Sequence, residues 1–544
     1  MRSTMQDFGL TIGSILRFGA EVYGDSEVVT LLDGGARRRR SYAETADRAG
    51  RLANGLRALG VDGDQRVATF MWNNAEHLEA YLAVPAMGAV LHTLNIRLFP
   101  DQVVYIANHA EDSVVIVDSS LIPVLAPMLP QMSTVQTVLV AGDGDHAPLS
   151  ESGKQVLSYE AVLADAAASY PWPDDVDERS AAAMCYTSGT TGNPKGVVYS
   201  HRSCWLHSMS VCTANNNGLS FHDRTMPIVP MFHANAWGTP YAAFMSGADL
   251  IMADRFLQAE PLVGLIEAEQ VTISAAVPTI WNDILQFLRA NPGRDVSSVR
   301  AVFCGGSAVP RALIEAFDKE FGIPIVQGWG MTETSPVAAV ALPPEGATGE
   351  AIYDYRASQG RVLFGVEARI VDDAGEVQQR DGKAVGELEV RGPWITAAYY
   401  KNDGPDRFDG EWLRTGDVGT IDPQGYITLT DRAKDVIKSG GEWISSVELE
   451  VTLMAHPGVR EAAVVGVPDD KWQERPLACV VRQPDCTATP DEFRDWLAER
   501  VVKWWLPERW AFIDSVPKTS VGKFDKKVLR KSYADGDLDV TTLA

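Results

Sequence analysis

The sequence contains few cysteines, and none of them stands in a pattern that binds metal or forms a redox pair. There are 6 among 544 residues, and no two of them share the C-x-x-C spacing or a zinc-ligand spacing. We therefore expect reduced thiols, several of them in the core. A nucleophilic role stays open for Cys185, although Met184 and Tyr186 beside it favour the end of a buried strand.

The sequence also lacks long hydrophobic runs and an excess of basic residues. No apolar run reaches the length that spans a bilayer, and the first residues lack a clear signal-peptide cleavage pattern. With 48 basic and 72 acidic residues the net charge is −24, which argues against nonspecific binding to nucleic acid. We expect a cytoplasmic protein without an integral membrane segment, in which anionic ligands meet locally placed cations and amide groups.

Only one strong basic cluster stands out in this acidic chain, the run from Arg37 to Arg40. Such a run is typical of a solvated edge of a strand or turn. We interpret it in that way and assign no ligand to it.

The order of the expected elements indicates an α/β protein with more than one domain. A chain of 544 residues is longer than one ordinary core requires. Short β-branched runs such as 113–117 and 135–140 suit buried parallel strands, and they alternate with helical stretches. Ser41 and Glu44 form a capping-box pattern that opens a helix, and Gly60 should end it.

The pattern changes after about Gly360. Residues 361–371, 386–391 and 425–430 have the composition of strands joined by turns that contain glycine, aspartate or proline. A last α/β segment follows, with a helix predicted over 490–506. We therefore expect a large N-terminal domain of stacked α/β sheets with a β-rich subdomain, and a small C-terminal α+β domain.

The stretch YTSGTTGNPKG, residues 186–196, has the composition of a loop that holds polyphosphate. Glycine lets the backbone take positive φ and approach a ligand closely, and successive N–H groups in such a turn form an anion-binding concavity. The spacing differs from the Walker A pattern, and a polar hairpin turn is the alternative. The residues expected to contact phosphate are Thr187, Ser188, Gly189, Thr190, Thr191, Gly192 and Lys195.

Two further motifs place a carboxylate close to a glycine turn. In GWGMTE, residues 328–333, Glu333 can hold a hard divalent ion together with phosphate oxygens, and Trp329 offers a flat face for a purine ring. In WLRTGD, residues 412–417, the carboxylate of Asp417 can accept two hydrogen bonds from a ribose diol. Considered singly, the first stretch could equally be a core aromatic residue and a surface glutamate, and the second would usually be an ordinary turn.

Two motifs near the C-terminus combine lysines with glycines. The first comprises DRAKD, residues 431–435, and KSGGEW, residues 438–443. The second is PKTSVGKF, residues 517–524. By residue type alone they would be a charged helix end, a glycine turn and a surface lysine.

Together and in this order, the five motifs resemble the signatures of the adenylate-forming superfamily, which includes acyl- and aryl-CoA synthetases, luciferases and peptide-synthetase adenylation domains. The resemblance spans nearly the whole chain. It implies that the chain uses ATP and Mg²⁺, with Thr187 and Glu333 on the metal side and Asp417 at the ribose. It also implies adenylate contacts from Gly306, Gln327, Gly328, Trp329, Thr332, Arg432, Lys434, Lys438 and Trp443.

The resemblance further implies a mobile C-terminal domain, residues 431–544, that turns about Asp431 against residues 1–430. Lys523 would be the catalytic lysine. When a carboxylate attacks the α-phosphorus, negative charge builds on the phosphate oxygens, and an ammonium aimed there stabilises the transition state more than the ground state. The region of Gly440 and Gly441 would then meet the thiol of coenzyme A, the co-substrate.

The stretch FHANAW, residues 232–237, narrows the resemblance. It is similar to the segment of bacterial medium- and long-chain fatty acyl-CoA synthetases in which a tryptophan gates the fatty-acid tunnel. We therefore expect His233, Ala234 and Trp237 at the acid site, with a packed core tryptophan as the alternative for Trp237. The resemblance also implies a homodimer.

The expected activity is a two-step ligation of a fatty acid to coenzyme A. Ligases for short, thioether (methylthiopropionate) or aryl acids share all five motifs and stay open as alternatives. We do not expect a luciferase or a peptide-synthetase module, because neither a peroxisomal tripeptide nor a carrier domain follows the last motif. The alternative from another class is a noncatalytic nucleotide-binding homologue, which the presence of Lys523, Glu333 and Asp417 argues against.

Overall fold

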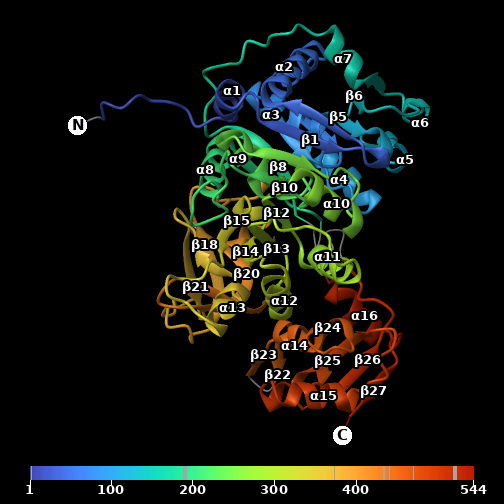
Figure 1. Ribbon diagram of the computed structural model, residues 1–544, viewed down its shortest axis with the longest axis vertical. Helices are drawn as coiled ribbons and strands as arrows, with labels where there is room; N and C mark the ends of the chain where they lie inside the picture. The colour runs from blue at the N-terminus through green and yellow to red at the C-terminus, as the bar shows by residue number, and fades with distance from the viewer. Residues whose placement is uncertain are drawn as a thin grey trace.

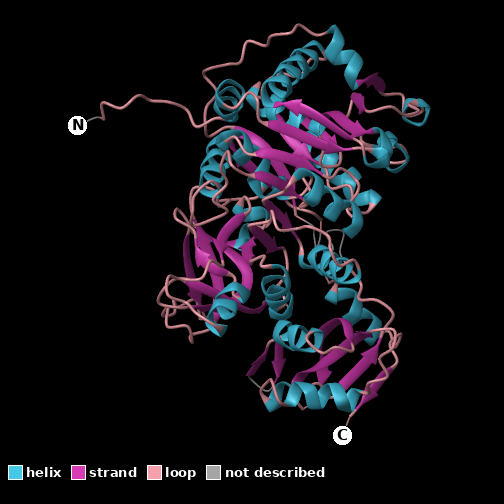
Figure 2. Ribbon diagram, in the orientation of Figure 1, coloured by secondary structure: helices cyan, strands magenta, loops and turns pink. Residues whose placement is uncertain are grey.

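The fold is α/β and contains three sheets (Figure 1). The computed structural model describes residues 1, 3–187, 193–372, 374–432, 435–439, 442–469, 471–518 and 524–543. These residues form sheets of 7, 14 and 6 strands, and Figure 2 shows helices beside each of them. The first two sheets and their helices make the large N-terminal part, and the third belongs to the smaller C-terminal part.

The 7-stranded sheet is parallel except for its last pair of strands, and that pair carries the glycine-rich stretch. Buried β-branched runs form two of its parallel strands, residues 112–118 and 137–141, as predicted. In spatial order the strands of the sheet are β7 (Gln155–Ser158), β6 (Thr137–Ala141), β5 (Asp112–Asp118), β3 (Arg66–Phe70), β4 (Val90–Thr93), β8 (Ala181–Tyr186) and β9 (Gly196–Ser200). Strand β9 runs antiparallel to β8.

The 14-stranded sheet has a parallel centre and antiparallel ends. The central strands are β14 (Ile325–Gly330), β13 (Ala301–Gly305), β12 (Ile273–Ala276), β10 (Arg224–Pro227), β11 (Asp249–Met252) and β1 (Glu27–Leu31), with β2 (Arg37–Ser41) at one edge. Beyond β14 follow β15 (Val337–Val340), β16 (Gly360–Val362), β21 (Tyr426–Arg432), β20 (Trp412–Ile421), β18 (Gly386–Arg391) and β17 (Glu367–Val371), with β19 (Phe408–Asp409) on β20. The β-rich region therefore continues the large sheet through β15 and β16 rather than forming a sheet of its own.

A layer of helices lies between the first two sheets, and α3 is its most buried member. Every residue of α3 (Ala75–Ala86) is buried. Most of its side chains are small or apolar, as a helix that packs on both sides needs, and its buried Glu76 and Glu79 pair with arginines of β2. Its neighbours are α1 (Ile12–Val22), α2 (Tyr42–Ala58), α8 (His201–Val211) and α9 (Thr239–Ser246). The capping box of Ser41 and Glu44 and the positive φ of Gly60, 87°, confirm the predicted start and end of α2.

Further helices cover the outer faces of the two sheets. Helices α4 (Pro100–Ala110) and α5 (Ile122–Leu125) share a core with the 7-stranded sheet, and α7 (Tyr159–Asp165) packs against α2. Helices α10 (Ala259–Glu269), α11 (Pro278–Ala290) and α12 (Arg311–Phe321) share a core with the 14-stranded sheet, and α13 (Glu350–Ala357) packs on α12. A short helix, α6 (Ala147–Ser150), precedes β7.

The C-terminal sheet has helices on both faces. Its strands are β22 (Ile437–Ser439), β23 (Glu442–Ile444), β24 (Val459–Asp469), β25 (Gln473–Arg482), β26 (Arg509–Phe512) and β27 (Val540–Thr542). Helices α14 (Ser446–Met454) and α15 (Pro490–Ala498) share one core with it, and α16 (Lys526–Ala534) another. In the region that the structure describes, every helix is too short or too polar to cross a membrane.

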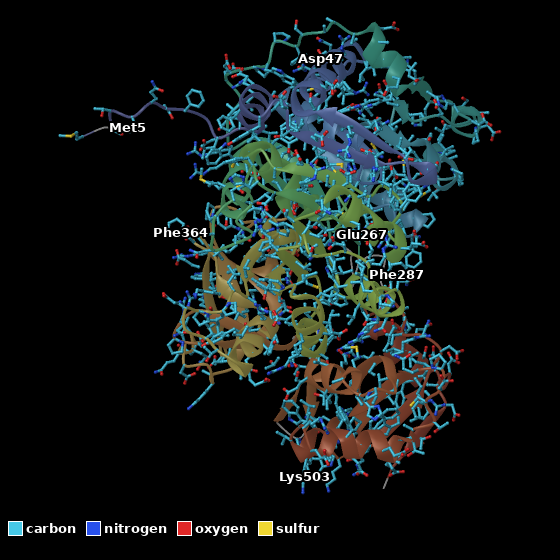
Figure 3. All side chains as sticks on the ribbon, in the orientation of Figure 1. Met5, Asp47, Glu267, Phe287, Phe364 and Lys503 are labelled. Carbon is cyan, nitrogen blue, oxygen red and sulfur yellow. The ribbon has the colours of Figure 1, made fainter. Side chains whose placement is uncertain are left out.

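The helix predicted over 490–506 is wrong in its second half, because α15 ends at Ala498. The guanidinium of Arg475, on β25, donates to the carbonyl oxygens of Trp504 at 2.9 Å and Leu506 at 3.2 Å. Those carbonyls therefore turn toward the sheet, and Lys503–Trp505 form only a 3-10 turn. Lys503 lies at the outer boundary of the C-terminal part, on the side away from the large N-terminal part (Figure 3).

The arginine run forms edge strand β2, as predicted, but it is not simply solvated. Arg38 pairs with buried Glu76 at 2.6 Å, and Arg40 pairs with fully buried Glu79 at 2.6 Å. Arg39 pairs with buried Glu269 at 2.7 Å. A charged edge strand resists pairing with another chain, so this ion-pair network has a structural role.

Two carboxylates, one at or just after the end of a strand in each large sheet, are bridged by Asn74, and we expect them to make the free energy of unfolding depend on pH. Asn74, which caps α3, donates to Asp118 at 3.0 Å and to Asp254 at 3.4 Å. Burial, and then the charge of Asp118, raise the pKa of Asp254 from 3.8 to about 7. A raised folded-state pKa contributes stability below the unfolded-state pKa, and that contribution is lost as the pH rises through about 7.

We expect the free energy of unfolding to fall by about 1 kcal/mol more between about pH 6 and pH 8 in the wild type than in Asp254→Asn. The neutral amide cannot ionise against Asp118, so its pH dependence should be flatter. Urea denaturation at both pH values measures the difference. Parallel pH dependence in the two proteins would contradict the assignment.

Candidate active site

The glycine-rich stretch connects the antiparallel strands β8 and β9, and hydrogen bonds between its described ends close its base. The amide of Thr187 donates to the carbonyl of Lys195 at 3.0 Å, and the amide of Lys195 donates to the hydroxyl of Thr187 at 3.1 Å. Below them Tyr186 pairs with Gly196 across the strands. The other residues predicted to contact phosphate, namely Ser188, Gly189, Thr190, Thr191 and Gly192, lie outside the described residues.

Tyr399, which the sequence analysis did not single out, connects this stretch to the GWGMTE motif. Its hydroxyl donates to Glu333 Oε1 at 2.5 Å, and its ring centroid lies 5.0 Å from the ammonium of Lys195. Glu333 is only 6% exposed. Burial raises the pKa of Tyr399, so it stays protonated and donates to the carboxylate. One aromatic side chain thus holds two candidate ligand groups that stand far apart in the sequence.

A second buried contact joins Trp329 to Asp417. The indole Nε1 donates to Asp417 Oδ2 at 2.9 Å, and both residues are buried. The amide of Asp417 donates to the hydroxyl of Thr415 at 3.1 Å, and Asp417 pairs with Arg432 between β20 and β21. The two motifs that we assigned to the nucleotide are therefore in direct contact.

Other predicted adenylate residues gather where β13 and β14 end side by side. Gly305 pairs with Gly328, and Gly306 follows in an exposed bend with φ of 85°. The side chain of Gln327 is engaged in fixing the backbone, because its Oε1 accepts from the amide of Val309 at 2.6 Å and its Nε2 donates to two carbonyls. The carbonyl of buried Thr332 accepts from the hydroxyl of Tyr199 at 2.6 Å.

The FHANAW stretch folds into a turn with left-handed backbone. Ala234, Asn235, Ala236 and Trp237 have φ of 45°, 51°, 47° and 55°. Such a run of L-residues costs on the order of 1 kcal/mol per residue, so the surroundings must hold it. The carboxamide oxygen of Asn235 accepts from Tyr81 Oη and from Cys185 Sγ, each at 3.2 Å.

This turn places Trp237 against the end of β13. A Cβ added at Gly305 would lie 3.3 Å from the Trp237 ring and 2.6 Å from the carbonyl oxygen of Gly328. A larger residue at 305 would therefore collide with backbone. Trp237 is half-buried and packs at the border of the core shared by the two large sheets. His233, also half-buried, precedes the turn.

The hinge region is described only in part. Arg432 ends β21, and Lys438 and Trp443 face each other between β22 and β23, but their side chains lie outside the described parts. Lys434, Gly440, Gly441 and Lys523 lie outside the described residues altogether. Asp431, by contrast, is described and buried.

The donors of the site suit Mg²⁺ rather than a softer metal. Among the described residues, no three histidine, cysteine, aspartate or glutamate side chains gather into a metal-binding group. Magnesium is usually held by one or two protein oxygens together with substrate phosphates. The Glu333 carboxylate and the Thr187 hydroxyl are such oxygen donors. Burial raises the pKa of Cys185 to about 11, so that thiol is neither a thiolate ligand nor a ready nucleophile.

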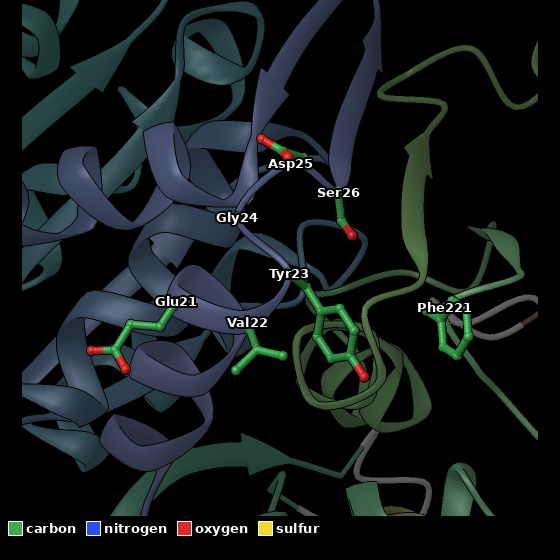
Figure 4. A pocket seen from close by; sticks show the side chains of 7 residues that line it. All are labelled: Glu21, Val22, Tyr23, Gly24, Asp25, Ser26 and Phe221. Carbon is green, nitrogen blue, oxygen red and sulfur yellow. The ribbon is translucent and has the colours of Figure 1, made fainter.

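A hollow at the end of α1 has no part in this site. It has a volume of about 410 Å³ and is lined by Glu21–Ser26 and Phe221 (Figure 4). Tyr23 and Phe221 stack across it, with ring centroids 6.4 Å apart. None of these residues belongs to the five motifs.

Comparison with known proteins identifies the family. Residues 17–400 match the family described as AMP-binding enzyme, and residues 448–523 match the AMP-binding enzyme C-terminal domain. The chain therefore belongs to the AMP-binding enzymes.

The relatives and the similar structures agree with this assignment. The chain is 43% identical to a 3-methylmercaptopropionyl-CoA ligase of Ruegeria pomeroyi, over 97% of this chain and 98% of the relative. It is 44% identical to a long-chain-fatty-acid–CoA ligase of Thermus thermophilus, over 98% and 97%. The anthranilate CoA ligase AuaEII, solved with anthranoyl-AMP, superposes with a TM-score of 0.87 at 25% identity, over 99% of this chain and all of that one. Acid–CoA ligation through an adenylate is the class of activity that these likenesses support.

Proposed function

We propose that this chain is an ATP-dependent ligase that joins a medium- or long-chain fatty acid to coenzyme A. The carboxylate attacks the α-phosphorus of ATP, pyrophosphate leaves, and an acyl-adenylate forms. The thiol sulfur of coenzyme A then attacks the acyl carbonyl, its proton is lost and AMP leaves. The observation that carries the proposal is that the motifs meet: Trp329 donates to Asp417, and Tyr399 contacts both Glu333 and Lys195.

In the first step, the residues of the site bind and orient the nucleotide. The stretch from Thr187 to Lys195 would receive the phosphates through amide groups and the ammonium of Lys195. Asp417, held by the indole of Trp329, would accept hydrogen bonds from the ribose diol. Thr187 and Glu333 would hold Mg²⁺, which when bound neutralises phosphate charge.

In the second step, residues 431–544 would turn about Asp431 against residues 1–430. A hinge is a short segment that absorbs the backbone change, and Asp431 stands at the end of β21, where the large sheet leads toward the C-terminal sheet. The turn would remove Lys523 from the phosphorus and bring the region of Gly440 and Gly441 to the thiol.

Two observations support a fatty acid as the substrate. One is the turn that places Trp237 against the end of β13, and the other is the similarity to fatty-acid–CoA ligases, including a medium-chain enzyme of Ectopseudomonas oleovorans at 41% identity. Ligation of 3-methylmercaptopropionate is the second candidate, because that Ruegeria ligase is equally similar over the full length. Thioester formation measured for acids from acetate to stearate, with thioether and aromatic acids beside them, distinguishes the two. A preference for the thioether acid would replace the fatty-acid assignment.

Trp237 offers a direct test of the acid site. We expect Trp237→Ala to compress the spread of kcat/KM between the best and the worst straight-chain acid by about tenfold, because each methylene in an apolar pocket is discriminated by packing. Trp205→Ala is the matched control, since Trp205 is also half-buried against the same core. A chain-length profile unchanged in Trp237→Ala would remove Trp237 from the acid site.

A further inference from the structure

A buried lysine stands where the large sheet meets the C-terminal sheet. Lys526, the first residue of α16, is 9% exposed, and the groups around it are as deeply buried. Its ammonium lies 2.8 Å from Glu450 Oε1 and donates to Ser446 Oγ at 2.5 Å. Burial acts to lower the pKa of Lys526, but Glu450 and Asp431 raise it above its ordinary value, so the ammonium stays charged.

From Lys526 a hydrogen-bond chain leads to the proposed hinge. The hydroxyl of Ser446 donates to Asp431 Oδ2, and the amide of Ser446 donates to the same oxygen at 2.7 Å. Beside it, the hydroxyl of Ser445 donates to the carbonyl of Thr430. The N-terminus of α14 is thus docked on a carboxylate, an arrangement that the helix dipole favours.

These bonds cross between two parts of the fold. Asp431 pairs with Val418 and so belongs to the 14-stranded sheet. Ser446 and Glu450 lie on α14, and Lys526 lies on α16, which both pack on β24 of the C-terminal sheet. A turn of that sheet about Asp431 would break the Asp431–Ser446 contact and leave the Lys526–Glu450 pair intact.

The Lys526–Glu450 pair has enough partners without the hinge. Glu450 Oε1 also accepts from the amide of Val464 at 2.7 Å, so the pair is satisfied inside the C-terminal part. The Ser446 hydroxyl forms hydrogen bonds that connect this pair to Asp431, in addition to the charge of Asp431, which acts on Lys526 directly. Its removal therefore takes away these hydrogen bonds between the hinge and the ion pair, while Glu450 still pairs with Lys526 and Asp431 still accepts from the amide of Ser446.

In the orientation that these bonds hold, the C-terminal part lies beside α11 of the large N-terminal part (Figure 1). Lys518, which precedes the Lys523 segment, lies close enough to Asp283 on α11 to act on its carboxylate. Helix α11 begins directly after Val277, and a Cβ added at Gly306 would lie 3.3 Å from that residue.

We propose that Ser446 and Lys526 are positioning residues that latch the hinge carboxylate Asp431 in the adenylation orientation. The latch rests on the proposed two-step function, in which one orientation forms the adenylate and the other forms the thioester. When the Asp431–Ser446 contact breaks, the C-terminal sheet is free to turn into the orientation that forms the thioester. Lys526 follows Lys523 by three residues and begins α16, so its hydrogen bond to Ser446 connects the helix that follows the catalytic lysine to the hinge.

The test compares Ser446→Ala, Ser446→Thr and the paired change Lys526→Met with Glu450→Gln, using Lys527→Met on the exposed neighbour as the control. Adenylation is followed by pyrophosphate release without coenzyme A, and thioester formation by supplying the acyl-adenylate. We expect Ser446→Ala and the paired variant to slow adenylation relative to thioester formation by about tenfold, because a hydrogen bond to a charged group is lost. Ser446→Thr, which keeps the hydroxyl, should restore the ratio.

Hydrogen exchange in the ligand-free protein tests the latch without any activity. Amides of residues 442–448 should exchange about tenfold faster in Ser446→Ala, while those of β24 and β25 stay protected. A ratio of half-reactions equal to the wild type, or both rates falling together with the melting temperature, would overturn the latch. If the wild type forms no adenylate, the proposed function fails, and the exchange result alone then supports or overturns the latch.

Discussion

Replacing Lys523 with alanine is expected to slow adenylation by on the order of 10²–10³, comparable with the loss of one oxyanion-hole donor. As the carboxylate attacks, charge develops on the nonbridging and leaving oxygens of the α-phosphate, and the ammonium favours that state over the ground state. The described flanks of the segment are held together. The backbones of Lys518 and Phe524 form an isolated antiparallel β-bridge, and the amide of Asp525 donates to the carbonyl of Pro517 at 2.7 Å.

The measurement is single-turnover pyrophosphate release with a saturating acid, and Lys527→Ala is the matched control because Lys527 is exposed on the following helix. Thioester formation from supplied acyl-adenylate should be nearly unchanged in Lys523→Ala, since that step has no need of charge at the α-phosphorus. An adenylation rate equal to the wild type would remove the catalytic role from Lys523. Equal losses in both steps would point to misfolding instead.

The elements that the sequence predicted well depend on local chemistry. The capping box of Ser41 and Glu44 and the cap at Asn74 both involve contacts within four residues, and the structure contains both. The link between the β-rich region and the large sheet could not be predicted in that way, since Val340 on β15 pairs with Arg361 on β16 across an intervening helix. The early end of α15 was missed for the same reason, because distant Arg475 binds the carbonyls that follow.

The same distinction holds within the site. The sequence identified Glu333 and Asp417 as candidate ligands, because a carboxylate within a glycine-containing motif is visible along the chain. It did not identify Tyr399, which reaches Glu333 across 66 residues, and nothing in the surrounding AAYY sequence marks it. It named Trp237 but not the left-handed turn beneath it. That backbone depends on Asn235 meeting Tyr81 and Cys185, which come from two other elements.

The contact between Tyr399 and Glu333 leads to the second large effect, which we expect for Glu333→Gln. The amide is nearly the same shape and can still accept from Tyr399, so the fold should survive, but the anionic oxygen for Mg²⁺ is gone. A metal ion contributes several kcal/mol to stabilising charge in phosphoryl transfer. We therefore expect adenylation to fall by on the order of 10²–10³ at the Mg²⁺ concentration that half-saturates the wild type.

Tyr399→Phe separates the metal ligand from its support. It leaves the carboxylate in place and removes only the hydrogen bond of 2.5 Å that orients it. Loss of such an outer partner weakens metal binding or activity by about 10- to 100-fold. The Mg²⁺ dependence of pyrophosphate release should therefore shift to higher concentration in Tyr399→Phe, and excess Mg²⁺ should restore most of its rate. In Glu333→Gln the same excess should restore little. A wild-type Mg²⁺ requirement in Glu333→Gln would show that the buried carboxylate serves the fold, and the metal would then have to be assigned to other oxygens.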